Sequence, residues 1–97
     1  MADSRPTVLL VDDEPLSIET MTRILDERFD VRSALDAKQA EGILTEEWVQ
    51  VVVSDQRMPG TTGVELLAIV RERWPEVVRI IISGYTDAED IIDDGYG

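Results

Sequence analysis

The sequence predicts an α/β protein with a doubly wound parallel sheet in a single domain. Two apolar, β-branched runs, at 7–11 and 49–53, each lead within two residues to an aspartate and are followed by a segment with helical periodicity. Strands that alternate with helices imply right-handed crossovers, a parallel sheet and helices on both of its faces. The 97 residues are enough for one domain with its own core, so no second domain is expected.

The first helix is predicted to run from Pro15 to about Arg28, after the strand at 7–11 and an acidic turn. Helical spacing brings four apolar side chains onto one face or beside it, and we expect them to belong to the core: Ile18, Met21, Ile24 and Leu25. This helix should therefore bury its inward face against the sheet.

The second strand is predicted at 30–34, where the sequence is more polar than in the other strands and suits the edge of a sheet. Asp36 then stands at the position expected for a helix N-cap. The helix that it caps should turn three small or apolar residues inward: Ala37, Ala40 and Leu44. Gly42 weakens the helix propensity of this segment without ending it.

The central strand is predicted to begin at Val49 and to end at Asp55. Its continuous β-branched run has the composition of a strand that is buried on both faces. Pro59 and Gly60 after it indicate a sharp turn, so Asp55 lies where the strand gives way to a loop.

A third helix is predicted at about 64–74 and is ended by Pro75. Its inward residues are expected to be Val64, Leu67 and Ala68. A fourth strand follows at 77–82 and leaves toward Ser83 at the same end of the sheet as the other strand ends. A last short helical segment is expected at 88–94, where acidic residues are not offset by any basic residue.

Three aspartates are expected to meet at one edge of this sheet. Asp12 and Asp13 follow the first strand and Asp55 ends the central one, and the carboxyl ends of parallel strands face the ligand crevice. Close carboxylates repel, so at least one should have a raised pKa unless a hard cation such as Mg2+ accepts their oxygens as ligands. The alternatives are that Asp55 closes a turn and that Asp13 or Glu14 caps a helix.

The charge balance and the residue types exclude several classes of function. With 21 acidic against 9 basic residues, the formal net charge of -12 argues against non-specific binding to nucleic acid or to anionic membranes. There is no cysteine, no secretory segment and no apolar run of transmembrane length, so we expect a cytoplasmic protein. Serine or cysteine hydrolysis is excluded because both histidine and cysteine are absent.

Other phosphate chemistries do not match the acidic turn after the first strand. That turn has neither a Walker phosphate loop nor a Gly-x-Gly-x-x-Gly pattern. A dehalogenase-like phosphohydrolase places its two aspartates two residues apart after one strand, whereas Asp12 and Asp13 are adjacent and Asp55 belongs to another strand.

This arrangement resembles the receiver domain of bacterial two-component response regulators over nearly the whole chain, 1–97. Four motifs carry the resemblance: Val-Asp-Asp-Glu at 11–14, Ser-Asp-Gln-Arg-Met-Pro-Gly at 54–60, Gly-Val-Glu-Leu-Leu at 63–67 and Ile-Ile-Ser-Gly-Tyr-Thr-Asp at 81–87. The wording Asp-Gln-Arg-Met-Pro, with Arg-Glu-Arg-Trp-Pro-Glu at 71–76, is most similar to receivers of the nitrogen-regulator class, particularly those of hydrogenase transcriptional regulators. The resemblance implies a flavodoxin-like sheet with strand order 2-1-3-4.

The resemblance also implies a role for each residue of the acidic edge. Asp55 would be the phosphoacceptor and would take a phosphoryl group from a histidine kinase. Mg2+ would be bound by Asp12, Asp13 and Asp55 together with the backbone carbonyl of Arg57. Ser83 would be the switch hydroxyl that contacts a phosphoryl oxygen, although a turn hydroxyl that satisfies local backbone is the alternative. Such a domain is not an enzyme in the ordinary sense, but it promotes its own phosphotransfer and dephosphorylation.

The sequence departs from the family pattern at its C-terminal end. A receiver continues into a fifth strand with a phosphate-binding lysine and a switch aromatic, then a fifth helix and, in a full regulator, an effector domain. The one lysine of this chain, Lys38, belongs to the predicted second helix. Two functions therefore stay open: a signalling receiver, and a truncated or engineered module that keeps the acidic metal site but does not switch.

Without a fifth strand and helix, we expect apolar surface to be uncovered. The strand at 77–82 would become an unprotected edge, and the sheet face around Val8, Leu10, Val51 and Val53 would face water. The chain is therefore expected to be a homo-oligomer.

Overall fold

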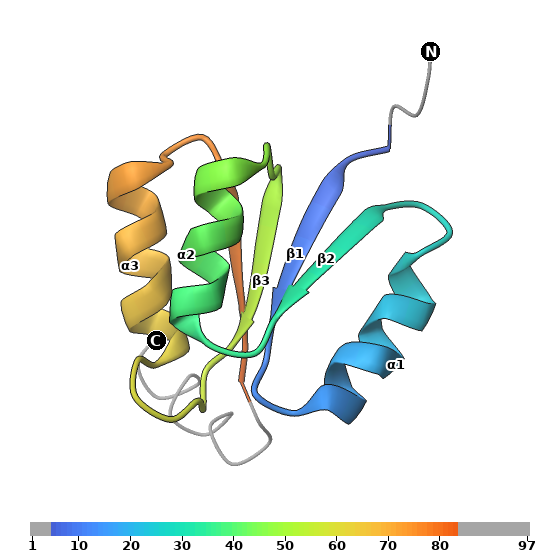
Figure 1. Cartoon of the computed structure of the whole chain (residues 1–97), viewed down its shortest axis with the longest axis horizontal. Helices are drawn as coiled ribbons and strands as arrows, with labels where there is room; N and C mark the ends of the chain where they lie inside the picture. The colour runs from blue at the N-terminus through green and yellow to red at the C-terminus, as the bar shows by residue number, and fades with distance from the viewer. Residues whose placement is uncertain (1–4, 84–97) are drawn as a thin grey trace, which may run out of the picture.

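A computed structural model describes residues 5–83 as a four-stranded sheet with helices on both faces (Figure 1). The elements are β1 (Thr7–Val11), α1 (Pro15–Leu25), β2 (Asp30–Ala34), α2 (Ala37–Glu46), β3 (Val51–Asp55), α3 (Gly63–Arg73) and β4 (Val78–Ile82). All the pairings are parallel, and the strand order is β2-β1-β3-β4. The predicted fold class and strand order are confirmed, while the helical segment expected at 88–94 lies outside the described residues.

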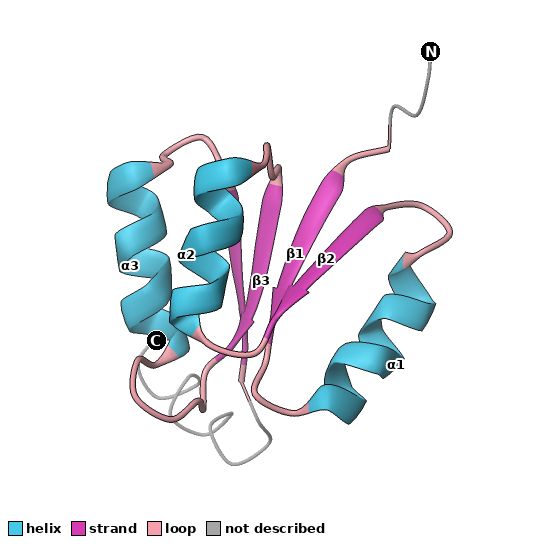
Figure 2. Cartoon of the chain, in the orientation of Figure 1, coloured by secondary structure: helices cyan, strands magenta, loops and turns pink. Residues whose placement is uncertain are grey.

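The helices divide unequally between the two faces of the sheet. Helices α2 and α3 lie side by side on one face, and α1 covers the other (Figure 2). Helix α1 contacts β1 and β2, the half of the sheet that is farthest from β4. Within residues 5–83, no helix is long and apolar enough to cross a membrane.

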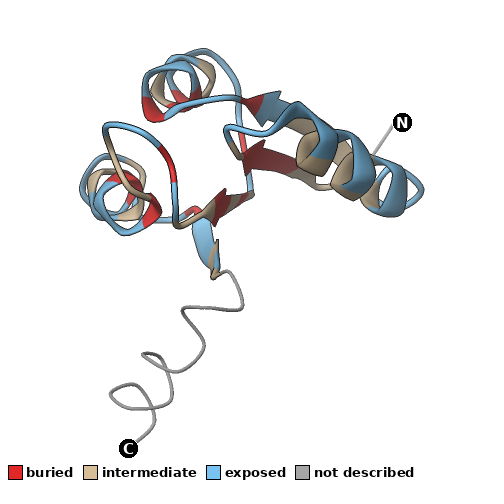
Figure 3. Cartoon of the chain, turned by 90° about the horizontal axis from the view of Figure 1, so that it is seen from below, coloured by how far each residue is buried: buried red, intermediate tan, exposed pale blue. Residues whose placement is uncertain are grey.

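The main cluster of buried side chains lies between the sheet and the pair α2 and α3. Side chains from alternate positions of β1 and β3 meet the inward residues of both helices there. Figure 3 shows buried segments on the sheet, α2 and α3, and none on α1. The buried cluster consists of Leu9, Val11, Ala34, Ala37, Ala40, Leu44, Val49, Val52, Met58, Leu66, Val70 and Val77. The predicted inward face of α2 is therefore confirmed, and Asp36 caps that helix by accepting a hydrogen bond from Gln39 N at 2.8 Å.

Helix α1 is shorter and less buried than the sequence suggested. It ends at Leu25 rather than near Arg28, and none of its residues is fully buried. Of the four residues expected in the core, Ile24 is 66% exposed and the other three are only partly buried. The spacing does mark the inward side of the helix, but α1 lies over one half of the sheet, so water reaches the edges of that contact.

The inward face of α3 differs from the prediction by a rotation of the helix. Val64 is 58% exposed and Ala68 is exposed, so the expectation that they face the core was wrong. The helix begins one residue earlier than expected, at Gly63, because Thr62 accepts a hydrogen bond from Glu65 N and forms a capping box with it. The buried stripe is then Gly63, Leu66 and Val70, with Leu67 partly buried beside it.

The burial of the sheet falls from β1 toward β4 on the face that α1 covers. Val8 and Leu10 of β1 are buried under α1, so the expectation that they face water was wrong. Strand β3 begins at Val51 rather than Val49, and Val51 and Val53 are partly buried, so this strand is not buried on both faces. The side chains of β4 are the exposed ones on this face: Val78 at 55%, Ile80 at 45% and Ile82 at 42%.

Candidate functional site

The parallel pairing of β1 with β3 brings the predicted acidic residues together. The register sets Val11 beside Ser54, so Asp12 and Asp55 follow at the same edge of the sheet. Carboxylate oxygens of Asp12, Asp13 and Asp55 all lie within 4.8 Å of one another. Asp12 and Asp55 are partly buried, while Asp13 is exposed. The grouping expected from the sequence is thus present, and it has the oxygen donors that a hard divalent cation prefers.

The turn after β1 holds Asp12 in place. Its backbone N donates to Ala34 O at 3.1 Å, and its carboxylate Oδ1 accepts from Glu14 N at 3.0 Å. Glu14 occupies the N-cap position of α1 but makes no capping hydrogen bond with its side chain. One alternative raised by the sequence was that the Glu14 side chain caps α1. That alternative is wrong, because the side chain makes no capping hydrogen bond.

Asp55 has a raised pKa because burial beside apolar side chains penalises its charged form. The negative charges of Asp12 and Asp13 raise it further, and the backbone N–H groups of Gln56 and Arg57 partly offset the effect. The repulsion expected of close carboxylates without a cation therefore contributes to the raised pKa of Asp55, after the effect of burial.

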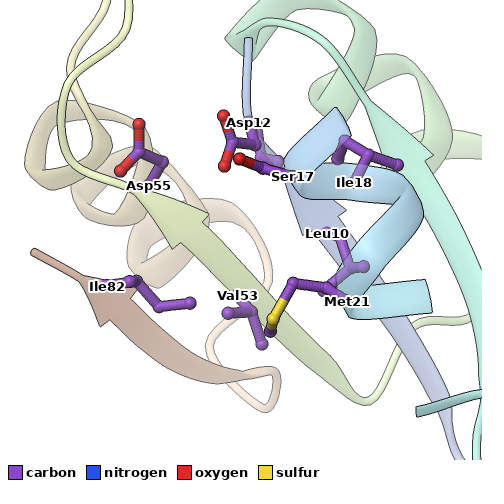
Figure 4. A pocket seen from close by; sticks show the side chains of 9 residues that line it. Leu10, Asp12, Ser17, Ile18, Met21, Val53, Asp55 and Ile82 are labelled. Carbon is purple, nitrogen blue, oxygen red and sulfur yellow. The ribbon is translucent and has the colours of Figure 1, made fainter. Parts of the chain in front are cut away.

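A cavity of about 20 Å³, close to the space needed by one water molecule, lies beside Asp55 between the sheet and α1. Figure 4 shows the carboxylates of Asp12 and Asp55 at one end of it and Met21, Val53 and Leu10 at the other. The remaining lining residues are Val11, Ser17, Ile18 and Ile82. Apolar walls on this side explain why desolvation is the largest cause of the shift at Asp55.

Ser83 and Arg57 lie next to this edge in the chain. Ile82 of β4 pairs with Asp55, so Ser83 leaves the sheet at the acidic end, partly buried. Arg57 is exposed, two residues after Asp55, and precedes the buried Met58. The roles that the resemblance assigns to Ser83 and to the Arg57 carbonyl stay predictions.

Gln56 is a residue of this site that the sequence reasoning did not single out. Its backbone O accepts from Gly63 N at 3.1 Å and its side-chain Oε1 accepts from Val64 N at 2.9 Å. Its own backbone N donates to Ile82 O at 3.1 Å. The only signal in the sequence is a long amide side chain directly after the strand-end aspartate, and that does not show which helix the amide reaches.

Comparison with known families decides what kind of domain this is. The model of the response regulator receiver domain matches residues 8–94, which include all the strands and helices described above apart from Thr7, the first residue of β1. The chain belongs to the response regulator receiver domain family. The resemblance inferred from the four motifs is thereby confirmed.

The most similar relatives include regulators of transcription. The chain is 56% identical over 92 residues to the hydrogenase transcriptional regulatory protein HoxA of Cupriavidus necator, and 50% identical over 86 residues to HoxA of Bradyrhizobium diazoefficiens. These matches cover 95% and 89% of this receiver chain but only 19% and 18% of the relatives. The receiver thus spans about a fifth of the length of the curated proteins that it matches.

Solved receiver structures have the same fold. A response regulator receiver protein from Pseudomonas putida aligns with a TM-score of 0.81 at 29% identity, over 95% of this chain and 78% of that one. The signal receiver domain of an HD domain-containing protein from Pseudomonas fluorescens Pf-5 aligns with a TM-score of 0.80 at 27% identity, over 94% and 76% of the two chains. The flavodoxin-like character of the sheet follows from these neighbours together with its strand order.

Proposed function

We propose that this receiver accepts a phosphoryl group on Asp55 from a histidine kinase and that it does so with Mg2+. The observation that carries the proposal is the group of carboxylates from Asp12, Asp13 and Asp55, whose oxygens lie within 4.8 Å of one another at the carboxyl edge of the sheet. Membership of the receiver family supports the same role for this edge.

The donor set fits the proposed cation. Three carboxylates supply hard oxygen ligands, and Asp13 is open to solvent. Burial raises the pKa of Asp55, and the charges of Asp12 and Asp13 raise it further, an effect that a bound cation would oppose. The backbone carbonyl of Arg57 would be a further ligand. When bound, Mg2+ would neutralise charge on the oxygens of the phosphoryl group as it moves.

The residues of the chain have separate tasks in the proposed transfer. A carboxylate oxygen of Asp55 forms the new bond to phosphorus while the bond from phosphorus to the kinase imidazole nitrogen breaks, and the electron pair stays on that nitrogen. The hydroxyl of Ser83 would donate a hydrogen bond to a phosphoryl oxygen. The apolar side chains beside Asp55 would limit the access of water to the acyl phosphate and so slow its hydrolysis.

The names of the relatives support a proposal for the output of this receiver. HoxA is named as a transcriptional regulatory protein in both relatives, and we propose that this receiver serves the same kind of output in the cytoplasm. A net charge of -12 disfavours direct contact of this chain with nucleic acid, so an effector domain would make that contact.

Phosphorylation can be tested with the isolated 97-residue chain. Incubation with Mg2+ and a small acyl phosphate donor should add one phosphoryl group, read by intact mass and lost on removal of Mg2+. Asp55→Asn should abolish the adduct, because a neutral amide replaces the nucleophilic carboxylate. Glu14→Gln is the control, since Glu14 is an exposed acid of the same turn that lies outside the carboxylate group.

An adduct of unchanged yield in Asp55→Asn would contradict the assignment of the phosphoacceptor. An adduct of unchanged yield without Mg2+ would contradict the role of the cation.

A further inference from the structure

The segment between Asp55 and α3 is held by one residue, Gln56. Helix α3 has four N-terminal N–H groups that need acceptors outside the helix ladder. Two of them, from Gly63 and Val64, donate to the backbone O and to the side-chain Oε1 of Gln56 at 3.1 and 2.9 Å. The other two are satisfied within the capping box, where Thr62 N donates to Glu65 Oε1 at 2.9 Å and Glu65 N donates to Thr62 Oγ1 at 3.2 Å. The residue that directly follows the proposed phosphoacceptor thus satisfies half of these groups.

Gln56 is also tied to the opposite side of the site. Its backbone N donates to Ile82 O at 3.1 Å, which extends the pairing of β3 with β4 one step beyond the strand. Just before it, Ser54 Oγ donates to the backbone O of Asp55 at 2.9 Å, and Ser54 is fully buried. The peptide groups on either side of the Asp55 side chain are therefore held by partners in β3, β4 and α3.

The loop that carries Arg57 leaves from Gln56 and returns to it. The hydrogen bond from Gly63 N to Gln56 O closes this loop, and Met58 fixes its interior because only 7% of its surface is exposed. Arg57 is therefore bracketed by two residues that cannot easily move. The Asp55 carboxylate and the Arg57 carbonyl, both proposed as Mg2+ ligands, are the immediate neighbours of Gln56 in the chain.

We propose that Gln56 is a positioning residue of the acidic site, which uses its side-chain hydrogen bond to α3 to set the geometry of the Asp55 carboxylate and the Arg57 carbonyl. This inference rests on the proposed function, because it concerns the Mg2+ ligands. Gln56 does not touch the cation or the phosphoryl group. It acts through its neighbours in the chain, as the hydrogen-bonded supports of metal ligands generally do.

Two variants of the full chain separate positioning from ordinary helix capping. Gln56→Met keeps the length of the side chain and removes its acceptor. Thr62→Val is the matched control, because it removes the acceptor of the neighbouring Glu65 N at the same end of α3 without altering a bond to the Asp55 segment. Both variants should lower the melting temperature, since each leaves one first-turn N–H without its acceptor.

Mg2+ titration followed by amide shifts is the deciding measurement. Gln56→Met should weaken Mg2+ binding by about tenfold, whereas Thr62→Val should stay within about twofold of the parent chain. In the absence of metal, the amide resonances of Asp55 and Arg57 should move in Gln56→Met and stay in place in Thr62→Val. Gln56→Glu keeps an acceptor for Val64 N and should bind Mg2+ at least as tightly as the parent.

The outcomes distinguish this inference from the function on which it rests. Failure of the parent chain to bind Mg2+ would overturn the proposed function and this inference with it. If the parent binds Mg2+ and Gln56→Met binds it equally well, or if Thr62→Val loses as much affinity, only the positioning role is overturned. Should Gln56→Met fail to melt cooperatively, Gln56→Asn, whose amide is one methylene short of Val64, takes its place under the same criteria.

Discussion

Asp55 lies between a largely apolar cavity and the carboxylates of Asp12 and Asp13. Burial and these two negative charges both raise its pKa. Because its pKa is raised above the ordinary value of 3.8, the folded chain binds this proton more readily than the unfolded chain. Ionised Asp55 therefore destabilises the metal-free fold at neutral pH. Stability should rise as the pH falls through the raised pKa, until the ordinary value for the unfolded chain is reached.

Removal of this charge should stabilise the chain when no metal is present. Asp55→Asn should raise the melting temperature by a few degrees at pH 7, and the gain should shrink as the pH approaches 4. Calorimetry across this range measures the effect. Glu76→Gln removes the same charge from an exposed turn and should show a smaller gain. A gain for Asp55→Asn that is independent of pH would contradict the burial argument.

Asp13 is the member of the carboxylate group that is open to solvent, and its main task in the proposal is to hold the cation. Asp13→Asn should weaken Mg2+ binding by at least about tenfold, roughly 1.4 kcal/mol, because an anionic ligand becomes neutral. Calorimetric titration measures the affinity, with Glu14→Gln as the control for the loss of one charge nearby. Equal affinities for Asp13→Asn and the parent chain would remove Asp13 from the site.

Individual residues were predictable where their place followed from strand ends. Asp12, Asp13 and Asp55 could be brought together from the sequence because parallel strands share a carboxyl edge, and the structure groups them. Gln56 could not be found in this way. Its side chain reaches a backbone N–H eight positions farther along, and that contact depends on how α3 sits against β3.

At the scale of the elements, the backbone at the start of α3 lies close against the end of β3. A Cβ atom added to Gly63 would stand 2.8 Å from Ile81 Cδ1 and 3.0 Å from the carbonyl carbon of Asp55, and closer still to the Asp55 carbonyl oxygen. Gly63 is therefore needed for its lack of a side chain, which lets the helix begin against the strand.

Gly63→Ala should destabilise the fold by about 1–3 kcal/mol, because α3 must move away from β3. Gly42→Ala is the matched control in α2, since a Cβ there meets nothing within 4 Å and the site is exposed. That variant should stabilise the chain by about 0.5–1 kcal/mol through helix propensity. Urea unfolding measures both changes, and an equal effect of the two substitutions would contradict the close approach.

The type and order of the elements were predictable from the sequence, but the rotation of a helix about its own axis was less so. Val64, Leu67 and Ala68 form an apolar stripe, yet Leu66, Leu67 and Val70 form another one turned slightly about the same helix axis. The capping box of Thr62 with Glu65 decides between them, because it sets where the helix starts. For α1 the spacing identified the side that faces the sheet. How deeply that side is buried depends also on how much of the sheet and which neighbouring elements surround the helix, and periodicity carries no information on these.

At the scale of the molecule, apolar side chains of β4 are exposed on the face of the sheet that carries α1, in the half that α1 does not reach. Val78, Ile80 and Ile82 are 55%, 45% and 42% exposed, in a strand at the edge of the described sheet. Such a strand tends to pair or pack with another surface, and a second copy of this chain is the partner we expect. The net charge of -12 opposes this association and is screened by salt.

Self-association should therefore strengthen as the ionic strength rises. Sedimentation at micromolar concentration should show a growing share of dimer between low and moderate salt. Ile80→Lys should weaken the dimer by about tenfold or more, whereas Val64→Lys, at a more exposed apolar site on α3, should leave it unchanged. A folded monomer across the whole range of salt would contradict the prediction of a homo-oligomer.

The unequal packing on the two faces of the sheet also affects which parts of the molecule open locally. Helix α1 has no fully buried residue, whereas α2 and α3 each have three, one of which is Gly63 at the start of α3. Amide hydrogens of α1 should therefore exchange with solvent through local openings of low free energy, while those of β1 and β3 exchange only when the whole domain unfolds. Since Ser17, Ile18 and Met21 line the cavity beside Asp55, each opening of α1 would briefly hydrate the acidic site from behind.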